Sequence, residues 1–309
     1  MKQKGETSAH GKKQQWQHPS VLALLENCGA GLCPRKIIRR RATELIDYAR
    51  RLGWYGPPYD PKILASILGI RVREKNLRAG TDGVLRTDGE DHLEILVRQG
   101  LPKTRENFTI CHEIAHTLFP DCFEIVRMRK QRGKVENHHL ELELLCNLAA
   151  AELLMPMEKF SSDVVYHGYS LKRVHPLAER YEASPEAVVR RMIATELEIS
   201  CAVFFRRMKK PSEEKSRFTT GPETQAQKMR VEYSIPSADF PVYIPKFKSV
   251  RDNSCVNQAL FSQEVICATE EWRLKNTCSF RVEAQVGPAP KGSRAGDCRV
   301  TALIFPNYF

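Results

Sequence analysis

The sequence lacks several features that would place it in a specialised class of protein. No stretch approaches the roughly 18 consecutive apolar residues of a transmembrane helix. Residues 1–18 are polar and lack the apolar centre of a secretory signal. Gly and Pro number only 17 and 18 among 309 residues, which excludes a collagen-like or low-complexity chain. We therefore expect a cytoplasmic protein with two or three folded domains and no membrane contact.

Cysteine is present, but not in the spacing of a cysteine zinc site. The ten cysteines include no CxxC pair, which argues against a zinc ribbon. In the cytoplasm they are expected to be reduced thiols. Cys111, Cys122 and Cys146 lie close to the motif described below. We interpret them as small apolar packing residues rather than as a thiol switch or metal ligands.

Positive charge exceeds negative charge and gathers near the N-terminus. The chain holds 48 Lys and Arg against 37 Asp and Glu, a net charge of +11. Residues 1–53 alone hold eleven cations and four carboxylates. Such a run either attracts nucleic acid or an acidic partner, or forms a solvated tail and helix face. The solvated interpretation is favoured, because charge runs mostly serve solubility.

Hydrophobic periodicity predicts a mixed α+β chain. Residues 1–35 are expected to form a flexible basic arm, 36–160 a folded core, 161–205 a helical segment and 206–230 a polar linker, followed by a strand-rich domain over 231–309. Helices are predicted at about 35–52, 61–68, 102–119, 136–154, 170–182 and 185–199, and strands at 70–73, 83–86, 94–97, 280–286 and 300–305. Asp60, Thr104 and Ser184 are candidate helix caps.

One predicted helix carries an HExxH motif, residues 112–116. Residues four apart lie on one helical face, so His112 and His116 can present two nitrogens to one zinc ion. Glu113 lies one position further round the helix and is the candidate catalytic base. These residue types in this spacing predict a metal-dependent hydrolase.

A catalytic zinc needs a third protein ligand, and several residues of the sequence are candidates for it. No Gly-x-x-His continuation follows His116. The candidates are Glu143, favoured because it shares a helical face with Asn147 and Ala151, and then His138, His139, Glu141 and Glu152. Small residues on that face would let the two helices approach closely, and Asn147 is predicted to orient a ligand.

The two helical motifs together resemble the ImmA/IrrE family of metallo-endopeptidases. The segments are residues 107–116 (NFTICHEIAH) and 143–156 (ELLCNLAAAELLMP), and the resemblance extends over about 55–200. It implies a zincin-like core over 36–160, Zn²⁺ held by His112, His116 and Glu143, and Glu113 as the base. Cys146 and Leu148 stand where that family usually has Ala and Phe.

Residues 177–192 read as helix, turn and helix, similar to the helix-turn-helix segment that follows the peptidase core in this family. Direct DNA contact would need an exposed second helix. Packing or partner docking is favoured, in part because Glu182 stands where a turn glycine is common. By the same resemblance, the strand-rich residues 231–309 are expected to form a GAF-like sensor domain, and the alternative is a structural lid or an oligomerisation module.

The sequence thus predicts a cytoplasmic zinc-dependent endopeptidase. The family resemblance implies that its substrate is a helix-turn-helix transcriptional repressor, cleaved at a defined site to derepress stress or mobile-element genes. The alternative is a non-catalytic regulator that binds DNA or a repressor and holds a structural metal. Glu113 favours the peptidase, because a structural metal site does not need a base.

Overall fold

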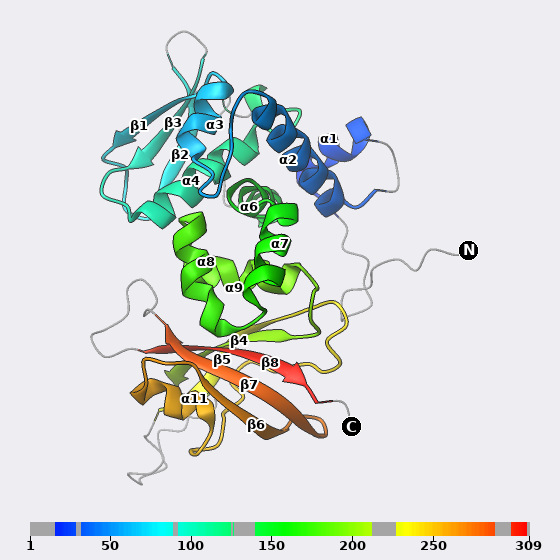
Figure 1. Ribbon diagram of the computed structural model, residues 1–309. Coiled ribbons are helices and arrows are strands. Elements are labelled where there is room, and N and C mark those ends of the chain that lie inside the picture. Colours follow the sequence, from blue (N-terminus) through cyan, green and yellow to red (C-terminus); the bar gives the residue numbers. More distant parts are fainter. Residues whose placement is uncertain are drawn as a thin grey trace. The chain divides into compact units, whose positions relative to one another are not determined.

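Two separately packed units, Met1–Pro156 and Met157–Phe309, make up the chain. The computed structural model describes residues 16–28, 32–88, 92–124, 126, 140–211, 227–287 and 298–307. Figure 1 shows the first unit as blue to green helices with a small sheet, and the second as green helices on a larger sheet. Both units mix helices with strands, so the predicted α+β class is confirmed.

The first unit contains a three-stranded sheet with the order β1-β3-β2. β1 (Arg71–Lys75) pairs with β3 (Leu93–Arg98) in parallel, and β2 (Gly83–Thr87) pairs with β3 antiparallel. The three predicted strands are therefore present. Ile95 and Val97 of the central strand are fully buried. β2 is an edge strand, and it lies against the helix α4 (Lys103–His116).

Other helices of the first unit pack directly or indirectly on α4. α6 (Leu140–Leu154) packs against α4 and against α2 (Pro34–Arg51), and α3 (Pro61–Ile67) packs against α4. The predicted Asp60 cap is confirmed, since its carboxylate accepts from Lys62 N at 2.7 Å. Arg41 of α2 donates to the backbone carbonyl of Leu118 at 2.6 Å, just beyond α4.

The prediction of a flexible arm over residues 1–35 is wrong for its described part. Pro19–Cys28 form the helix α1, which packs on α2 and α6. Val21 and Leu24, three residues apart, are fully buried. This short apolar pattern holds a helix only because tertiary packing supports it. Residues 1–15 and 29–31 of the predicted arm lie outside the described residues.

A five-stranded antiparallel sheet with the order β5-β4-β8-β7-β6 organises the second unit. Its strands are β4 (Cys201–Met208), β5 (Lys228–Pro236), β6 (Ile266–Arg273), β7 (Thr277–Gly287) and β8 (Arg299–Pro306). Phe205, Trp272 and Phe280 form an aromatic core on one face, with rings 5.6 to 6.0 Å apart. α11 (Cys255–Gln258), between β5 and β6, packs on this core.

The segment boundaries within the second unit differ from those predicted from the sequence. β4 begins at Cys201 and β5 at Lys228, so parts of the predicted helical segment and linker are strands of the sheet. The continuous apolar run Cys201–Phe205 is buried on both faces, which removes the alternation expected of a half-exposed strand. A helix that the sequence analysis missed, α7 (Met157–His167), opens this unit.

The predicted helix-turn-helix segment is present, but its second helix is packed against the sheet. α8 (Val174–Tyr181) ends at Glu182, which has a left-handed backbone (φ +46°), and α9 (Pro185–Ala194) begins after the Ser184 cap. α9 packs on β4 and β5. Arg191, Met192 and Ile193 are buried, as are Val188 and Val189. A helix covered in this way cannot enter a DNA groove without leaving the sheet.

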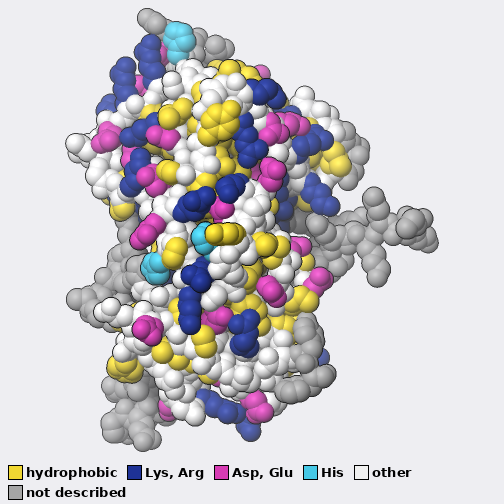
Figure 2. Space-filling model, in the orientation of Figure 1, with side chains coloured by type: hydrophobic (Ala, Val, Ile, Leu, Met, Phe, Trp, Pro, Cys, Tyr) yellow, Lys and Arg dark blue, Asp and Glu magenta, His cyan; other side chains and the backbone are white. Residues whose placement is uncertain are grey.

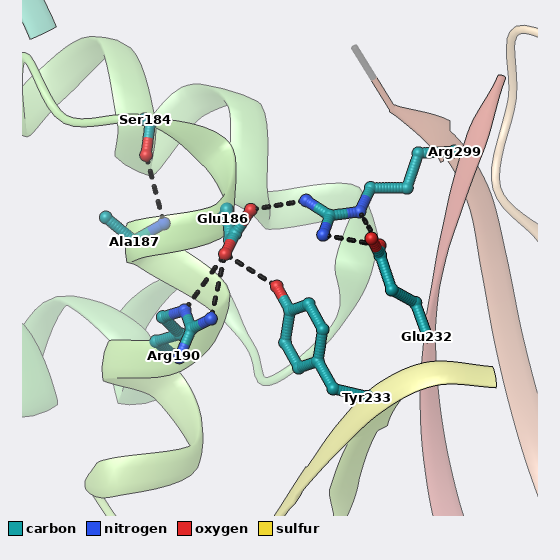
Figure 3. Close-up of polar contacts among 7 residues, drawn as sticks. All are labelled: Ser184, Glu186, Ala187, Arg190, Glu232, Tyr233 and Arg299. Carbon is teal, nitrogen blue, oxygen red and sulfur yellow. Dashed lines mark hydrogen bonds and ion pairs between the residues drawn. The ribbon is translucent and has the colours of Figure 1, made fainter. Parts of the chain in front are cut away.

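Glu186, in the first turn of α9, ties that helix to two strands (Figure 3). Its carboxylate accepts from Tyr233 Oη of β5 at 2.6 Å and from Arg299 Nη1 of β8 at 2.6 Å. Arg190 Nη2 donates to it at 2.9 Å. Arg299 also bonds Glu232 at 2.7 Å. The two guanidinium groups each lie within 6 Å of the stacked Phe204 and Tyr233 rings, a cation–π distance.

Surface charges support the solvated interpretation of the basic residues. On the face shown in Figure 2, Lys and Arg side chains are interspersed with Asp and Glu side chains. Within α2, Arg40 lies 3.5 Å from Glu44, and Arg50 lies 3.5 Å from Asp47. Such exposed pairs contribute little stability, but they dilute the positive field that nucleic acid would require.

Glu186→Gln should destabilise the second unit at neutral pH. Burial raises the pKa of Glu186, but hydrogen bonds from Tyr233 and Arg190 and the charge of Arg299 lower it more, so its net pKa is below the ordinary value. A carboxyl group whose pKa is lowered by folding stabilises the folded protein at pH values above the pKa it has in the unfolded chain. This stability is lost as the pH falls through the pKa of the folded state. Because 36% of the Glu186 side chain is exposed and solvent screens its charge, we expect a loss of only about 1 kcal/mol at pH 7.

Urea unfolding followed by circular dichroism measures the effect at pH 7 and at a series of pH values below the ordinary pKa of a glutamate. The difference between variant and wild type should shrink as the pH falls through the lowered pKa of Glu186, because the wild-type carboxylate then becomes protonated. Glu264→Gln, an exposed carboxylate in the same unit, is the control and should change neither value. Equal stability of Glu186→Gln and wild type at pH 7 would contradict the stabilising role assigned to the Glu186 carboxylate.

Candidate metal centre

The helix α4 places both histidines of the HExxH motif on one face. It begins at Lys103, after Pro102, and Thr104 therefore lies inside the helix rather than capping it, which corrects the prediction. Ile110, Ile114 and Ala115 are fully buried and fix the helix in the core. The His112 and His116 rings lie 5.1 Å apart, centroid to centroid, as expected one helical turn apart.

α6 brings Glu143 to these two rings. Glu143 Oε2 lies 3.1 Å from His112 Nε2, and Glu143 Oε1 lies 4.0 Å from His116 Nε2. The two imidazoles are nearly buried, while 44% of the Glu143 side chain is exposed. The structure therefore brings together the three residues that the sequence analysis favoured as ligands, and it leaves one side of them open to solvent.

The same helix contacts the outer nitrogen of each imidazole. His112 Nδ1 donates to Asn147 Oδ1 at 3.1 Å, as predicted for a residue that orients a ligand. His116 Nδ1 lies 3.4 Å from the sulfur of Cys146, a contact that the sequence analysis missed. The contact with Asn147 fixes the His112 ring so that its Nε2 faces Glu143, and in the neutral imidazole that donates from Nδ1 this Nε2 is the nitrogen left to bind a metal.

The pKa of His112 lies above its ordinary value. Burial lowers it, but the hydrogen bond to Glu143 and the charges of Glu113 and Glu143 together raise it more, with a further contribution from Asn147. Protons therefore compete with a metal ion for His112, and acid should weaken metal binding.

Glu113 points from α4 toward the edge strand β2. It is only 7% exposed, and its Oε2 accepts from Leu85 N at 2.8 Å. Gly83 of the same strand leaves room for it, since a Cβ there would lie 3.0 Å from Glu113 Oε1. Neither strand residue was singled out from the sequence, because no local pattern shows which strand will lie beside the motif.

Three donor atoms of this site suit a catalytic zinc ion. One nitrogen from each histidine and one Glu143 oxygen all lie within 4.8 Å of one another. Zinc bonds such nitrogens and oxygens at about 2.0–2.2 Å, and catalytic sites use three protein ligands with one open position. Among the described residues, this is the one group of three or more metal-binding side chains. The donor set therefore fits zinc.

The other candidate ligands lie elsewhere or outside the described chain. The Glu141 carboxylate accepts from the backbone amides of Gln17 and His18 at 2.8 and 2.9 Å. Glu152 is buried and does not belong to the group of three. His138 and His139 lie outside the described residues.

A small pocket adjoins His116 on the side of the core. Its walls are mostly apolar and come from α1, β2, α4 with the turn that follows it, and α6. The lining residues are Ser20, Leu85, His116, Phe119, Cys122, Val126 and Leu142. The Cys122 thiol is therefore a packing residue of the pocket wall, in agreement with the sequence interpretation.

Comparison with known proteins identifies the segment that carries this site. Residues 65–192 match the sequence model of the family Peptidase_M78, described as the IrrE N-terminal-like domain. Two curated relatives are both named radiation response metalloprotease IrrE. The protein from Deinococcus deserti is 31% identical over 121 residues, and the one from Deinococcus radiodurans is 27% identical over 99 residues.

These relatives are matched over part of their length. The alignments cover 35% and 32% of this chain and 42% and 30% of the two relatives. A solved structure, that of a Mycobacterium tuberculosis transcriptional regulator, resembles 88% of this chain over 76% of its own, with a TM-score of 0.54 and 14% identity. That likeness shows a shared fold alone. The resemblance to the ImmA/IrrE family inferred from the sequence is confirmed.

In the part of the chain that the structure describes, no helix is both long enough and apolar enough to cross a bilayer.

Glu143→Ala should weaken zinc binding at least about 100-fold, because it removes one of three ligands. Glu141→Ala is the matched control, since Glu141 lies on the same helix and its carboxylate binds backbone amides instead. Zinc affinity, measured by competition with a chelator, distinguishes the two. If His138→Ala or His139→Ala removes the metal while Glu143→Ala retains it, the ligand set is wrong.

Asn147→Ala should weaken zinc binding about 10-fold, by freeing the His112 ring, the magnitude typical of groups that orient a ligand. The same chelator competition measures it, and the exposed position of Asn147 makes a folding defect a poor explanation. Unchanged affinity would mean that packing alone orients His112.

Proposed function

We propose that this chain, whose residues 65–192 belong to the ImmA/IrrE family, is a zinc-dependent endopeptidase. One observation carries the proposal. His112, His116 and Glu143 converge with one side open. Glu113 lies between the two histidines in sequence, but its carboxylate accepts a hydrogen bond from the Leu85 amide instead. A site with three ligands and a separate carboxylate is built for hydrolysis rather than for structure.

His112, His116 and Glu143 would hold the ion. Zinc bound there would polarise the peptide carbonyl and make a water molecule more acidic. Glu113 would accept a proton from the attacking water and then deliver it to the departing amine nitrogen. Asn147 and Cys146 keep the two imidazoles in place through their Nδ1 atoms. The chemistry requires no other titratable residue for proton transfer.

The proposed substrate is a protein, and by family resemblance a helix-turn-helix transcriptional repressor. The two curated relatives are named metalloproteases of the radiation response, which supports a protein substrate and a role in stress. Cleavage of such a repressor in the cytoplasm would derepress the genes it controls. The five-stranded antiparallel sheet of the second unit supports the proposal of a GAF-like regulatory domain.

The competing function is a non-catalytic regulator that binds DNA or a repressor. Two observations weigh against it. The second helix of the predicted DNA-binding pair is buried against its own sheet, and Arg190 and Arg299 are committed to Glu186. Structural zinc sites close their coordination with a fourth protein ligand. No fourth member joins the metal-binding group within the described ranges.

Glu113→Gln separates catalysis from binding. The substitution keeps the size of the side chain and removes the basic oxygen, so the protein should fold and retain zinc. Turnover should fall by about 10²–10⁴-fold, as when a positioned acid or base is lost. Repressor cleavage is followed on a gel, with zinc measured in the same samples.

His112→Ala is the companion variant and should lose zinc and activity together. Cleavage by Glu113→Gln at a near wild-type rate would place the base elsewhere. Loss of zinc from Glu113→Gln would instead make Glu113 a ligand and overturn the proposed mechanism.

A further inference from the structure

The backbone of β2 offers hydrogen-bonding groups to the site rather than to the sheet. Asp82 O accepts from Arg98 N, and Asp88 N donates to His92 O, both at 2.8 Å. In an antiparallel pair, such bonded positions alternate with positions whose backbone groups face away. Gly83, Leu85 and Thr87 therefore direct their N–H and C=O groups away from β3, on the side of the sheet edge.

One of these groups reaches Glu113. Leu85 N donates to Glu113 Oε2 at 2.8 Å, and the Leu85 residue is 1% exposed. A hydrogen bond to an ionised acceptor is stronger and more directional than a neutral one. Because the amide belongs to a strand and not to a side chain, it holds the carboxylate oxygen at a fixed point.

Because Gly83 has no side chain, there is room beside it for the Glu113 carboxylate. A Cβ at this position would lie 2.4 Å from Thr109 Cγ2, 3.0 Å from Glu113 Oε1 and 3.1 Å from Glu113 Cγ. Gly83 is not among the glycines with positive φ, so its requirement is steric rather than conformational. The glycine lets β2 approach α4 at the turn that carries the base.

We propose that β2 is a positioning element for the catalytic base: the Leu85 amide fixes one oxygen of Glu113, and Gly83 leaves the carboxylate its place. The inference rests on the proposed peptidase function and deepens it. Gly83 and Leu85 touch neither substrate nor metal in this scheme, and they act through Glu113. Small errors in the position of a reacting group are costly, since about 1 Å of misplacement costs about 100-fold in rate.

Gly83→Ala and the double variant Gly83→Ala/Thr109→Ser test this proposal. Thr109→Ser removes the methyl group that a Cβ would strike first and keeps the hydroxyl. Gly83→Ala should lower the melting temperature and reduce kcat about 100-fold, with KM and zinc content unchanged. The double variant should regain the melting temperature but not kcat, because the contact with Glu113 remains.

Two single variants are controls. Thr109→Ser should be close to wild type in kcat. Gly287→Ala also adds a Cβ to a strand glycine, but its nearest neighbour would be 3.7 Å away, so melting temperature and kcat should not change. Recovery of kcat together with the melting temperature in the double variant would overturn the proposal, because Gly83 would then serve only packing against Thr109.

A readout independent of metal and activity comes from the amide signals of the metal-free protein in nuclear magnetic resonance. Glu113→Ala should move the Leu85 amide proton upfield and leave Val84, which faces Leu96 of β3, nearly unchanged. An unmoved Leu85 signal would refute the positioning contact. A wild-type protein that carries zinc but cleaves no peptide would refute the proposed function instead, and the Leu85 signal would still decide the contact.

Discussion

The close packing of α4 against α6 is the contact on which the metal centre depends. α4 supplies two imidazoles, and α6 supplies the carboxylate between them and a neighbour for each outer nitrogen. Positions 143, 146 and 147 lie three and four residues apart, so one helical face carries all three contacts. Ala150, one turn further along the same face, is small and fully buried, which permits the approach. One helix–helix interface thus fixes both the ligands and their orientation.

Local patterns predicted most of the elements and the grouping of the candidate ligands. The HExxH spacing, the Glu143 face and the Asp60 and Ser184 caps each depend on residues within one or two helical turns, and the structure contains all of them. Local pattern failed where tertiary packing decides. α1 is a short helix held by its neighbours, and β4 is an apolar run without alternation. Gly83 and Leu85 meet Glu113 only because the sheet edge lies beside α4.

The helix-turn-helix segment shows how a correct local prediction can leave function open. The cap, the turn and both helices are present where the sequence placed them, although α9 ends at Ala194 and not near residue 199. What the sequence could not show is which surface covers α9. Two partners of Glu186, Tyr233 on β5 and Arg299 on β8, are more than 40 residues away in the chain. They turn a helix that resembles a DNA reader into a layer of a folded domain. The Glu182 backbone, left-handed without glycine, belongs to this packed arrangement.

The strand order of the larger sheet has a consequence for how the chain folds during synthesis. β8, the last strand in sequence, lies between β4 and β7, and so joins the β4–β5 hairpin to the β6–β7 hairpin. Until residues 299–306 leave the ribosome, the two hairpins have no common partner and each exposes an unpaired edge. The unit with the metal site is translated well before that point. At typical rates of synthesis, about 5–20 residues per second, it has several seconds to fold while the second unit waits for its central strand.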